Sequence, residues 1–167
     1  AAGHRQAAAT GWCAVVSRWS LSTPGAQDLP ELLALLESCA LPGADLTGQH
    51  LAEFLVCREG GRIVGSAGLE FCADAVLLRS LAVTASHRRS GLASRLVAAL
   101  SEQALARGRS EMFLLTTSAV AFFAALGFRR VDRQRVPPAV AATAEFRTLC
   151  PASAVCMQRQ LTPSAAA

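Results

Sequence analysis

The stretch from residue 75 to residue 116 constrains the fold most, because its periodicity changes from strand to helix and back. Residues 75–83 are apolar on both faces except at Arg79 and Ser80, which is typical of a central strand. Four apolar residues, spaced four apart, then predict a helix of about four turns: Leu92, Leu96, Leu100 and Ala104. Residues 111–116 return to a strand pattern. The stretch therefore predicts a strand–helix–strand unit.

The rest of the chain supplies antiparallel strands before this unit and shorter elements after it. Gly60-Gly61 predicts a hairpin turn, and Ser118 is placed to N-cap a short helix that Gly127 ends. We expect, in chain order, a strand at 14–19, a helix at 26–39, a short helix within 43–50, strands at 53–58 and 62–70, a helix at 118–126, extended residues at 128–131, a helical segment at 139–143 and a closing strand at 153–160. This order predicts an α/β fold, with a mixed sheet of six to seven strands and about four helices on both faces.

The length of 167 residues suits one domain, which we expect to span residues 14–161, with flexible termini at 1–13 and 162–167. Hydrophobic residues make up 52% of the chain, but no window reaches the roughly 18 apolar residues that span a bilayer. The first residues lack the apolar core of a secretory signal. These features predict a cytoplasmic protein with no membrane partner.

The charge pattern argues against nucleic-acid binding. All 16 basic residues are arginine and the net charge is +4, but the arginines are scattered and few aromatic residues lie between them. The six cysteines form no C-x-x-C pair, and no histidine lies at metal-ligand spacing, so we expect no metal and mainly buried, reduced thiols. For Cys150 and Cys156, a soft-ion site or a disulfide remains an alternative.

The loop between the strand and the helix carries the chemistry. Backbone N–H groups at a helix start lack intrahelical partners, and the helix dipole favours a phosphate there. Gly91 permits positive φ or close approach, and the small side chain of Ala93 leaves the site open. Arg88 and Arg89 supply fork-shaped donors to phosphate oxygens. The loop therefore predicts a diphosphate cradle, although a basic, solvated helix start would match the same pattern.

Two motifs in the correct order resemble the GNAT superfamily of N-acetyltransferases. Residues 88–93 resemble its motif A, Q/R-x-x-G-x-G/A, and residues 121–128 resemble its later helix followed by Gly-Phe. The resemblance implies that acetyl-CoA binds in a V-shaped opening between the strand ending at Val83 and the strand ending near Thr116, without a metal. It implies cofactor contacts from Leu81, Ala82, Val83, Arg88, Arg89, Ser90, Gly91, Leu92, Ala93 and Ser94, and from Phe122 and Phe123 on the pantetheine.

Narrower resemblances point to the acceptor. Residues 114–117 and 122–128 resemble the acetyltransferase domain of N-acetylglutamate synthase, which acetylates an amino-acid α-amine. Residues 145–157 resemble a GNAT branch found in arsenic-resistance operons, some of whose relatives acetylate amino-acid-like toxins such as arsinothricin and phosphinothricin. The resemblance therefore implies a small-molecule amine as acceptor.

Amide formation needs a neutral amine, a polarised carbonyl and a protonated leaving thiolate. The N–H of Val83 is placed to polarise the carbonyl. Many family members use a Tyr to protonate the thiolate, but Phe123 occupies that position and the chain contains no Tyr. Because a CoA thiol is only weakly basic, water or the hydroxyl of Thr117 or Ser118 would suffice.

Glu70, at a strand end, is the best candidate for the general base, although an exposed structural charge is an equal interpretation. Arg79 is placed to bind a substrate carboxylate, or else it pairs with Glu70 or Glu53. Further substrate contacts are expected from Ser80, Thr116 and Ser153. His87 is interpreted as a loop residue beside the pyrophosphate.

Three functions follow from the sequence. The first is acetyl transfer to a small amino-acid-like amine by direct attack in a ternary complex. The second is acetylation of a peptide or protein N-terminus. The third is a non-catalytic sensor of acetyl-CoA, a function that the absence of Tyr supports. A monomer or a homodimer is expected.

Overall fold

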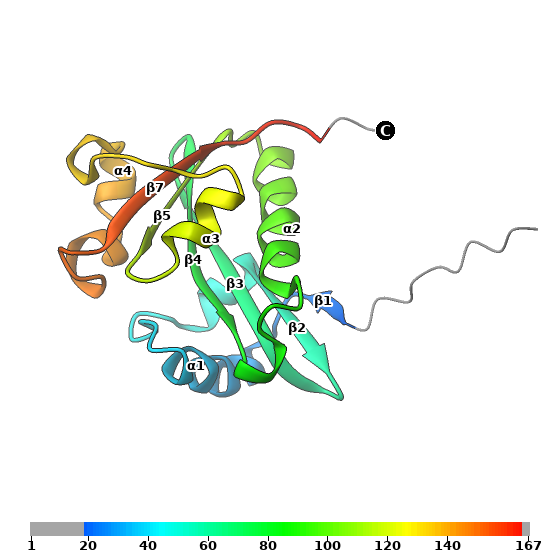
Figure 1. Cartoon of the computed structure of the whole chain (residues 1–167). Helices are drawn as coiled ribbons and strands as arrows, with labels where there is room; N and C mark the ends of the chain where they lie inside the picture. The colour runs from blue at the N-terminus through cyan, green and yellow to red at the C-terminus, as the bar shows by residue number, and fades with distance from the viewer. Residues whose placement is uncertain (1–18, 165–167) are drawn as a thin grey trace, which may run out of the picture.

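The computed structural model describes residues 19–164, which form one seven-stranded sheet flanked by helices (Figure 1). The strand order is β1-β2-β3-β4-β5-β7-β6. The strands are β1 (Ser20–Ser22), β2 (Phe54–Glu59), β3 (Arg62–Cys72), β4 (Ala75–Val83), β5 (Glu111–Thr116), β6 (Arg129–Arg130) and β7 (Val155–Gln160). Only the β4–β5 pair is parallel among these neighbours. The predicted mixed α/β sheet is confirmed.

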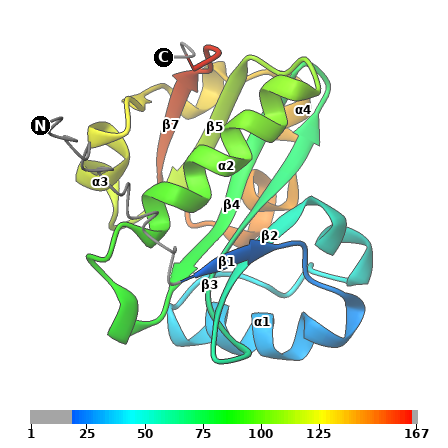
Figure 2. The same cartoon turned by 90° about the vertical axis from the view of Figure 1, so that its right-hand side faces the viewer.

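Helices cover both faces of the sheet (Figure 2). On one face, α2 (Leu92–Ala106) and α3 (Val120–Ala125) pack on the central strands through residues such as Leu96, Leu100 and Phe123. On the other face, α1 (Leu29–Ser38) packs on β2 and β3, and α4 (Pro138–Ala141) packs on β4 and β5. The apolar residues of β4 pack into the hydrophobic cores on both faces of the sheet. This explains why apolar and polar residues do not alternate along that strand.

Shorter helical turns connect these elements. They are the 3-10 turns η1 (Ala26–Asp28), η2 (Gly48–Glu53), η3 (Ala85–His87) and η4 (Arg133–Arg135), and the π-helical turn η5 (Glu145–Leu149). The helix expected at 26–39 is thus η1 followed by α1, and the short helix expected within 43–50 is η2, displaced toward β2.

One local prediction lies largely outside the described residues, and another differs from the structure. The strand expected at 14–19 is described only at residue 19, and the first described strand, β1, occupies Ser20–Ser22. Ser118 does not cap α3: the N-cap is Ala119, whose N–H donates to Thr116 Oγ1 at 3.0 Å. Thr116 is the last residue of β5, so this bond closes the turn between β5 and α3, and α3 has no side-chain cap.

The two central parallel strands pair only at their beginnings. Ala75, Val76 and Leu77 lie opposite residues 111–113, and no β5 partner continues the pairing along the rest of β4. Beyond that point β5 pairs with β7, and Figure 1 shows β4 and β5 diverging. The divergence opens the sheet at the carboxyl ends of both strands.

A β-bulge lies in β4 beside this opening. Gly68 faces Arg79 and Ser66 faces Ala82, so Ala67 alone opposes two residues of β4. Ser80 has a φ of +58°, and its carbonyl accepts a hydrogen bond from Ser66 Oγ at 2.9 Å. The extra residue places both Leu78 and Leu81 against the α2 core although they are three apart.

Candidate active site

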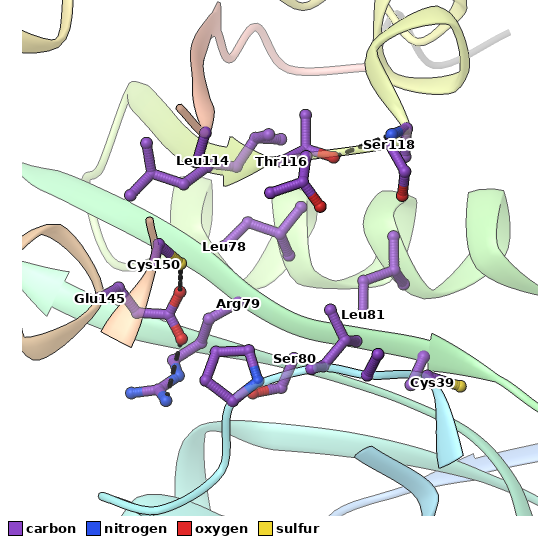
Figure 3. A pocket seen from close by; sticks show the side chains of 18 of the residues that line it. Cys39, Leu78, Arg79, Ser80, Leu81, Leu114, Thr116, Ser118, Glu145 and Cys150 are labelled. Atoms are coloured by element: carbon purple, nitrogen blue, oxygen red, sulfur yellow. Dashed lines mark hydrogen bonds and ion pairs between the residues drawn. The ribbon is translucent and has the colours of Figure 1, made fainter. Parts of the chain in front are cut away.

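A cavity of about 610 Å³ occupies the opening between the diverging strands. Figure 3 shows β4 and β5 as its two walls, with side chains from both facing the space between them. The remaining walls come from the end of α1, from α3 and from the segment around η5. The lining residues are Cys39–Pro42, Leu78–Val83, Arg88, Ala93, Leu114–Ala119, Phe122, Phe123, Glu145, Leu149–Pro151 and Ala154.

One end of the cavity reaches the first turn of α2. Gly91, the N-cap of α2, has a φ of +85°, and a Cβ built there would meet no heavy atom within 4 Å. Arg89 also has a positive φ, of 59°. Space at the helix start and a left-handed loop are what a pyrophosphate bound by backbone N–H groups requires. The loop therefore fits the predicted diphosphate group.

The predicted cofactor residues divide into two groups. Those that line the cavity are Leu81, Ala82, Val83, Arg88, Ala93, Phe122 and Phe123. Those in the loop or first turn that do not line it are Arg89, Ser90, Gly91, Leu92 and Ser94, and Leu92 is buried in the α2 core. Ser90 Oγ donates to the His87 carbonyl, which closes the loop. Their contacts with acetyl-CoA stay predictions.

Two side chains cover the strand end next to this loop. Arg88 Nε donates to the Val83 carbonyl at 3.4 Å, and Cys39 Sγ donates to the same oxygen at 3.6 Å. His87 is held outside the cavity by Glu59, with 2.7 Å between Nε2 and Oε2. His87 is thus a loop residue, as the sequence suggested.

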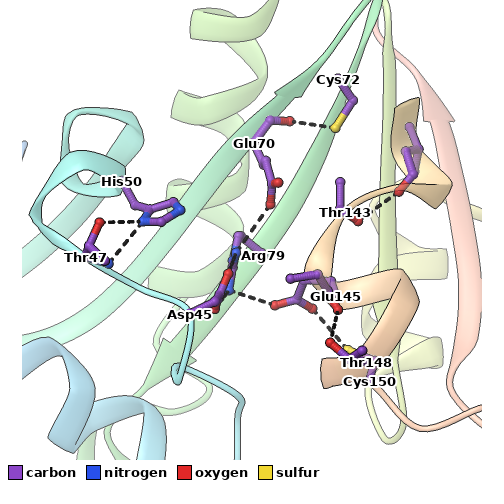
Figure 4. Close-up of polar contacts among 12 residues, drawn as sticks. Asp45, Thr47, His50, Glu70, Cys72, Arg79, Thr143, Glu145, Thr148 and Cys150 are labelled. Atoms are coloured by element: carbon purple, nitrogen blue, oxygen red, sulfur yellow. Dashed lines mark hydrogen bonds and ion pairs between the residues drawn. The ribbon is translucent and has the colours of Figure 1, made fainter. Parts of the chain in front are cut away.

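Arg79 is the polar centre of the other end of the cavity (Figure 4). Its side chain is 1% exposed and contacts three carboxylates. Nη1 and Nη2 each lie 2.7 Å from an oxygen of Asp45, Nη1 lies 3.3 Å from Glu70 Oε2, and Nη2 lies 3.1 Å from Glu145 Oε1. The predicted pairing with Glu70 is present, whereas Glu53 instead binds Arg107 at 2.7 Å.

The carboxylates around Arg79 differ in their electrostatics. Asp45 remains partly exposed and accepts one hydrogen bond from each terminal nitrogen of Arg79, and these hydrogen bonds lower its pKa. Glu145 has a single contact with Arg79 and a side chain that is 8% exposed, so burial raises its pKa. Of Asp45 and Glu145, Glu145 is therefore the carboxyl that more readily takes a proton.

Glu145 has a second partner, because Cys150 Sγ donates to its Oε2 at 3.0 Å. The two residues lie at opposite ends of the η5 turn, which brings the thiol back over the carboxylate. Burial raises the pKa of the Cys150 thiol to about 12, so it stays protonated at neutral pH. Cys150 is free rather than disulfide-bonded, as are Cys39, Cys57, Cys72 and Cys156; Cys13 lies outside the described residues.

The remaining predicted residues are placed as follows. Ser80, Thr116 and Thr117 line the cavity, but Glu70 and Ser153 do not. Phe123 is buried, with its ring centroid 5.1 Å from that of Phe122 and 5.5 Å from that of Phe128, both edge-on. Their catalytic and substrate-binding roles stay predictions.

Sequence reasoning missed Asp45 and Glu145, and it considered Cys150 only with Cys156, for a soft-ion site or a disulfide, and not as the partner of Glu145. Asp45 lies in a polar loop before η2, and Glu145 lies beyond two prolines in a segment without periodicity. The one available signal was Arg79 itself, because a charged side chain in an apolar strand requires a carboxylate partner. That signal predicts a partner without saying which part of the chain supplies it.

The described residues contain neither a membrane-crossing helix nor an evident metal centre. Within 19–164, no helix is long and apolar enough to cross a bilayer. Over the same range, no group of three or more His, Cys, Asp or Glu side chains is arranged to hold a metal ion.

Comparison with known proteins places this geometry in a family. Residues 50–130 match the family described as acetyltransferase (GNAT) domain. Amino-acid acetyltransferases from two strains of Neisseria meningitidis are 27% identical over 118 residues, which is 66% of this chain but 27% of theirs. The chain thus spans about a quarter of the length of these curated relatives.

Solved structures share the fold. N-acetylglutamate synthase from Neisseria gonorrhoeae, complexed with coenzyme A and N-acetyl-glutamate, has a TM-score of 0.75 at 24% identity over 86% of this chain and 35% of its own. A Mycobacterium tuberculosis protein complexed with coenzyme A has a TM-score of 0.72 at 20% identity, covering 86% of this chain and 99% of its own. The family match over residues 50–130 identifies an acetyltransferase (GNAT) domain in this chain, and the solved structures share its fold.

Proposed function

We propose that this protein transfers the acetyl group of acetyl-CoA to the amine of a small amino-acid-like molecule by direct attack in a ternary complex. The observation that carries the proposal is a single cavity that joins the start of α2 to the buried polar cluster around Arg79. One end suits a pyrophosphate and the other offers charged and hydroxyl groups to an acceptor. The open edge of β4 lies between the two ends.

The cofactor end is supported by local geometry. Ala82 and Val83 pair with β3 on one side, and Leu81–Val83 have no β5 partner on the other. Among the described residues, the Val83 carbonyl is contacted only by the side chains of Arg88 and Cys39. This edge of β4 is therefore where the pantetheine arm can pair along the cavity wall. In this arrangement the N–H of Val83 faces the thioester carbonyl, and backbone N–H groups of residues 89–94 hold the pyrophosphate at the helix start. Acetyl-CoA supplies the acetyl group, and the chain supplies its orientation.

The acceptor end favours a small substrate over a long peptide. Leu149, the last residue of η5, and the following Cys150 and Pro151 line this end beside Glu145. An amino-acid-like acceptor also accords with the curated relatives, which are amino-acid acetyltransferases. Phosphinothricin and arsinothricin belong to this chemical class, so both are included among the candidate acceptors.

A hydroxyl takes the place of the absent Tyr in this proposal. Thr117 and Ser118 are exposed and line the cavity immediately after β5, near Phe122 and Phe123. A thiolate leaving group is a weak base, so a hydroxyl or a water held by one is a sufficient proton donor.

The test is an assay for CoA release and for acetylated product. The protein is incubated with acetyl-CoA and, one at a time, with the proteinogenic amino acids, phosphinothricin, arsinothricin and a short peptide. Free thiol is measured with a colorimetric reagent, product is identified by mass spectrometry, and a reaction without amine gives the background hydrolysis. We expect N-acetylated product from at least one small amine and less from the peptide. Acetyl-CoA binding by calorimetry, with no product from any amine, would favour the sensor function instead.

A further inference from the structure

Glu145 differs from the other two carboxylates bound to Arg79. Asp45 and Glu70 contact the guanidinium from the loop before η2 and from β3, and neither lines the cavity. Glu145 reaches Arg79 from η5 and does line it. Figure 3 shows Glu145 and Cys150 toward one end of the cavity and Leu81 and Cys39 toward the other. Only one carboxylate of the cluster can therefore touch a bound acceptor directly.

We propose that Glu145 forms the acceptor-amine subsite: its carboxylate holds the substrate ammonium and takes the proton that must leave before the nitrogen can attack. This inference rests on the proposed amine acetylation. It moves the role of base from Glu70 on β3 to Glu145 on η5.

The charge of the cluster supports a cationic ligand. One guanidinium faces the three carboxylates of Asp45, Glu70 and Glu145, which leaves an excess of negative charge in a buried place. An ammonium against Glu145 supplies a missing positive charge. A substrate carboxylate would bring a fourth negative group to Arg79, whose fork Asp45 already fills. The cluster therefore favours the amine of the substrate over its acid.

An unpartnered hydroxyl lies next to Arg79 along β4. Ser80 is 8% exposed and lines the cavity, and its Oγ has no hydrogen-bond partner among residues 19–164. A buried hydroxyl without a partner is uncommon, because losing its hydrogen bonds to water costs about 1–3 kcal/mol. An acceptor bound against the Arg79 cluster can supply the missing partner, because Ser80 follows Arg79 directly in β4.

The proton transfer follows from the environment of Glu145. Burial raises its pKa, which brings the carboxylate closer to an amine as a proton acceptor. The ammonium gives one proton to Glu145, the nitrogen lone pair attacks the thioester carbon, and the C–N bond forms as the C–S bond breaks. The second nitrogen proton ends on the departing CoA sulfur, and Glu145 returns its proton to water.

Cys150 is a positioning residue in this account. Its thiol donates to Glu145 Oε2 at 3.0 Å, while Arg79 binds the other oxygen, Oε1. Both contacts favour the ionised carboxylate, and Asp45 and Glu70 oppose it through like charge. Arg79, Asp45, Glu70 and Cys150 are the charged or titratable groups that act on Glu145.

The first experiment compares Glu145→Gln with its rival, Glu70→Gln. Each removes one carboxylate from the same guanidinium, so loss of contact with Arg79 is common to both. Acetyl-CoA affinity, measured by calorimetry, reports whether each variant keeps the cofactor site. We expect kcat/KM for the best small amine to fall at least about 100-fold in Glu145→Gln and less than about threefold in Glu70→Gln.

A binding measurement keeps the inference testable without turnover. The protein is saturated with CoA and titrated with L-alanine, with L-alaninamide, which keeps the ammonium but lacks the acid, and with propionamide, which lacks the ammonium. We expect alaninamide to bind the wild type and Glu70→Gln, and to bind Glu145→Gln at least about tenfold more weakly. Propionamide should show the same affinity for all three proteins. Equal binding of alaninamide by the wild type and Glu145→Gln, or no binding to either, overturns the inference. Turnover that survives in Glu145→Gln also overturns it while leaving the proposed function intact.

Cys150→Ala tests the positioning role through the pH profile. Loss of the thiol hydrogen bond disfavours the ionised form of Glu145, so the acidic limb of kcat/KM should move to higher pH. A purely structural thiol would lower kcat at all pH values without moving that limb, and that result would remove Cys150 from the account.

Discussion

The guanidinium of Arg79 holds both carboxylate oxygens of Asp45, with nitrogen–oxygen distances of 2.7 Å on each prong. This bond joins β4, at the edge of the opening in the sheet, to the loop that precedes η2. The same guanidinium also contacts Glu145, which lines the proposed acceptor end of the cavity. The Arg79–Asp45 ion pair therefore helps to hold Arg79 in place against Glu145. The stability of the fold and the geometry of the proposed acceptor site therefore depend on one side chain.

Replacing Arg79 should destabilise the fold. Arg79→Met leaves three carboxylates without their shared cation, and breaking a buried ion pair in this way costs about 3–5 kcal/mol. The measurement is urea unfolding at pH 7, and the loss should shrink at acidic pH as the carboxylates protonate. Arg79→Lys keeps the charge without the fork and should be intermediate. Equal midpoints for Arg79→Met and the wild type would contradict the structural role of the cluster.

Asp45 and Glu145 should shift the pH dependence of stability in opposite directions. The pKa of Asp45 is lowered in the folded state by Arg79, so its contribution is present above its unfolded value of about 3.8 and is lost as pH falls. Asp45→Asn should lower the free energy of unfolding by about 1–3 kcal/mol at pH 7. It should also make the free energy of unfolding depend less on pH at acidic pH.

The pKa of Glu145 is instead raised by burial, so ionisation opposes folding as pH rises through the folded pKa. Glu145→Gln should therefore gain stability relative to the wild type with increasing pH. The measurement for both variants is the free energy of unfolding from pH 3 to pH 8. Parallel profiles for Asp45→Asn and Glu145→Gln would refute the opposed shifts.

Gly91 and Gly61 form a matched pair for testing the loop. Both have positive φ, 85° and 81°, and a Cβ at either would meet no heavy atom within 4 Å. Alanine at each should cost about 1–2 kcal/mol because only the backbone is strained. Gly91→Ala should also weaken acetyl-CoA binding, whereas Gly61→Ala, in the β2–β3 turn, should not. Equal acetyl-CoA affinities in the two variants would remove the loop from the cofactor site.

The hydroxyls after β5 should contribute modestly to catalysis. We expect the double variant Thr117→Val, Ser118→Ala to lower kcat about 10- to 100-fold, because a positioned proton donor is lost while water remains. Its acetyl-CoA affinity should stay near that of the wild type. Adding Phe123→Tyr restores the phenol common in the family and should recover part of kcat. An unchanged kcat in the double variant would assign thiolate protonation to water alone.

The strand–helix–strand unit was predictable because local pattern determines it. β4 and β5 span Ala75–Val83 and Glu111–Thr116, as their apolar runs predict, and α2 begins at Leu92, directly after Gly91. Burial on both faces requires a continuous apolar strand, and a left-handed residue before a helix favours glycine. These requirements act within a few residues, so they are visible in the sequence.

The acceptor end was less predictable because it depends on contacts between distant segments. Arg79 indicated a carboxylate partner, yet Asp45 and Glu145 lie in irregular segments whose positions only packing determines. The capping role expected of Ser118 is not filled by any side chain, and the N–H of the N-cap residue Ala119 binds Thr116 Oγ1 instead. The choice between Glu70 and Glu145 as base likewise required knowing which carboxylate lines the cavity.

The most direct test of the central claim is the rate of amine-dependent CoA release from acetyl-CoA, with the product identified by mass spectrometry, in the wild type, Glu145→Gln and Glu70→Gln. The account predicts an N-acetylated small amine from the wild type, a comparable rate from Glu70→Gln and a loss of at least about 100-fold in Glu145→Gln. Absence of acetylated product from every amine in the wild type would contradict the account.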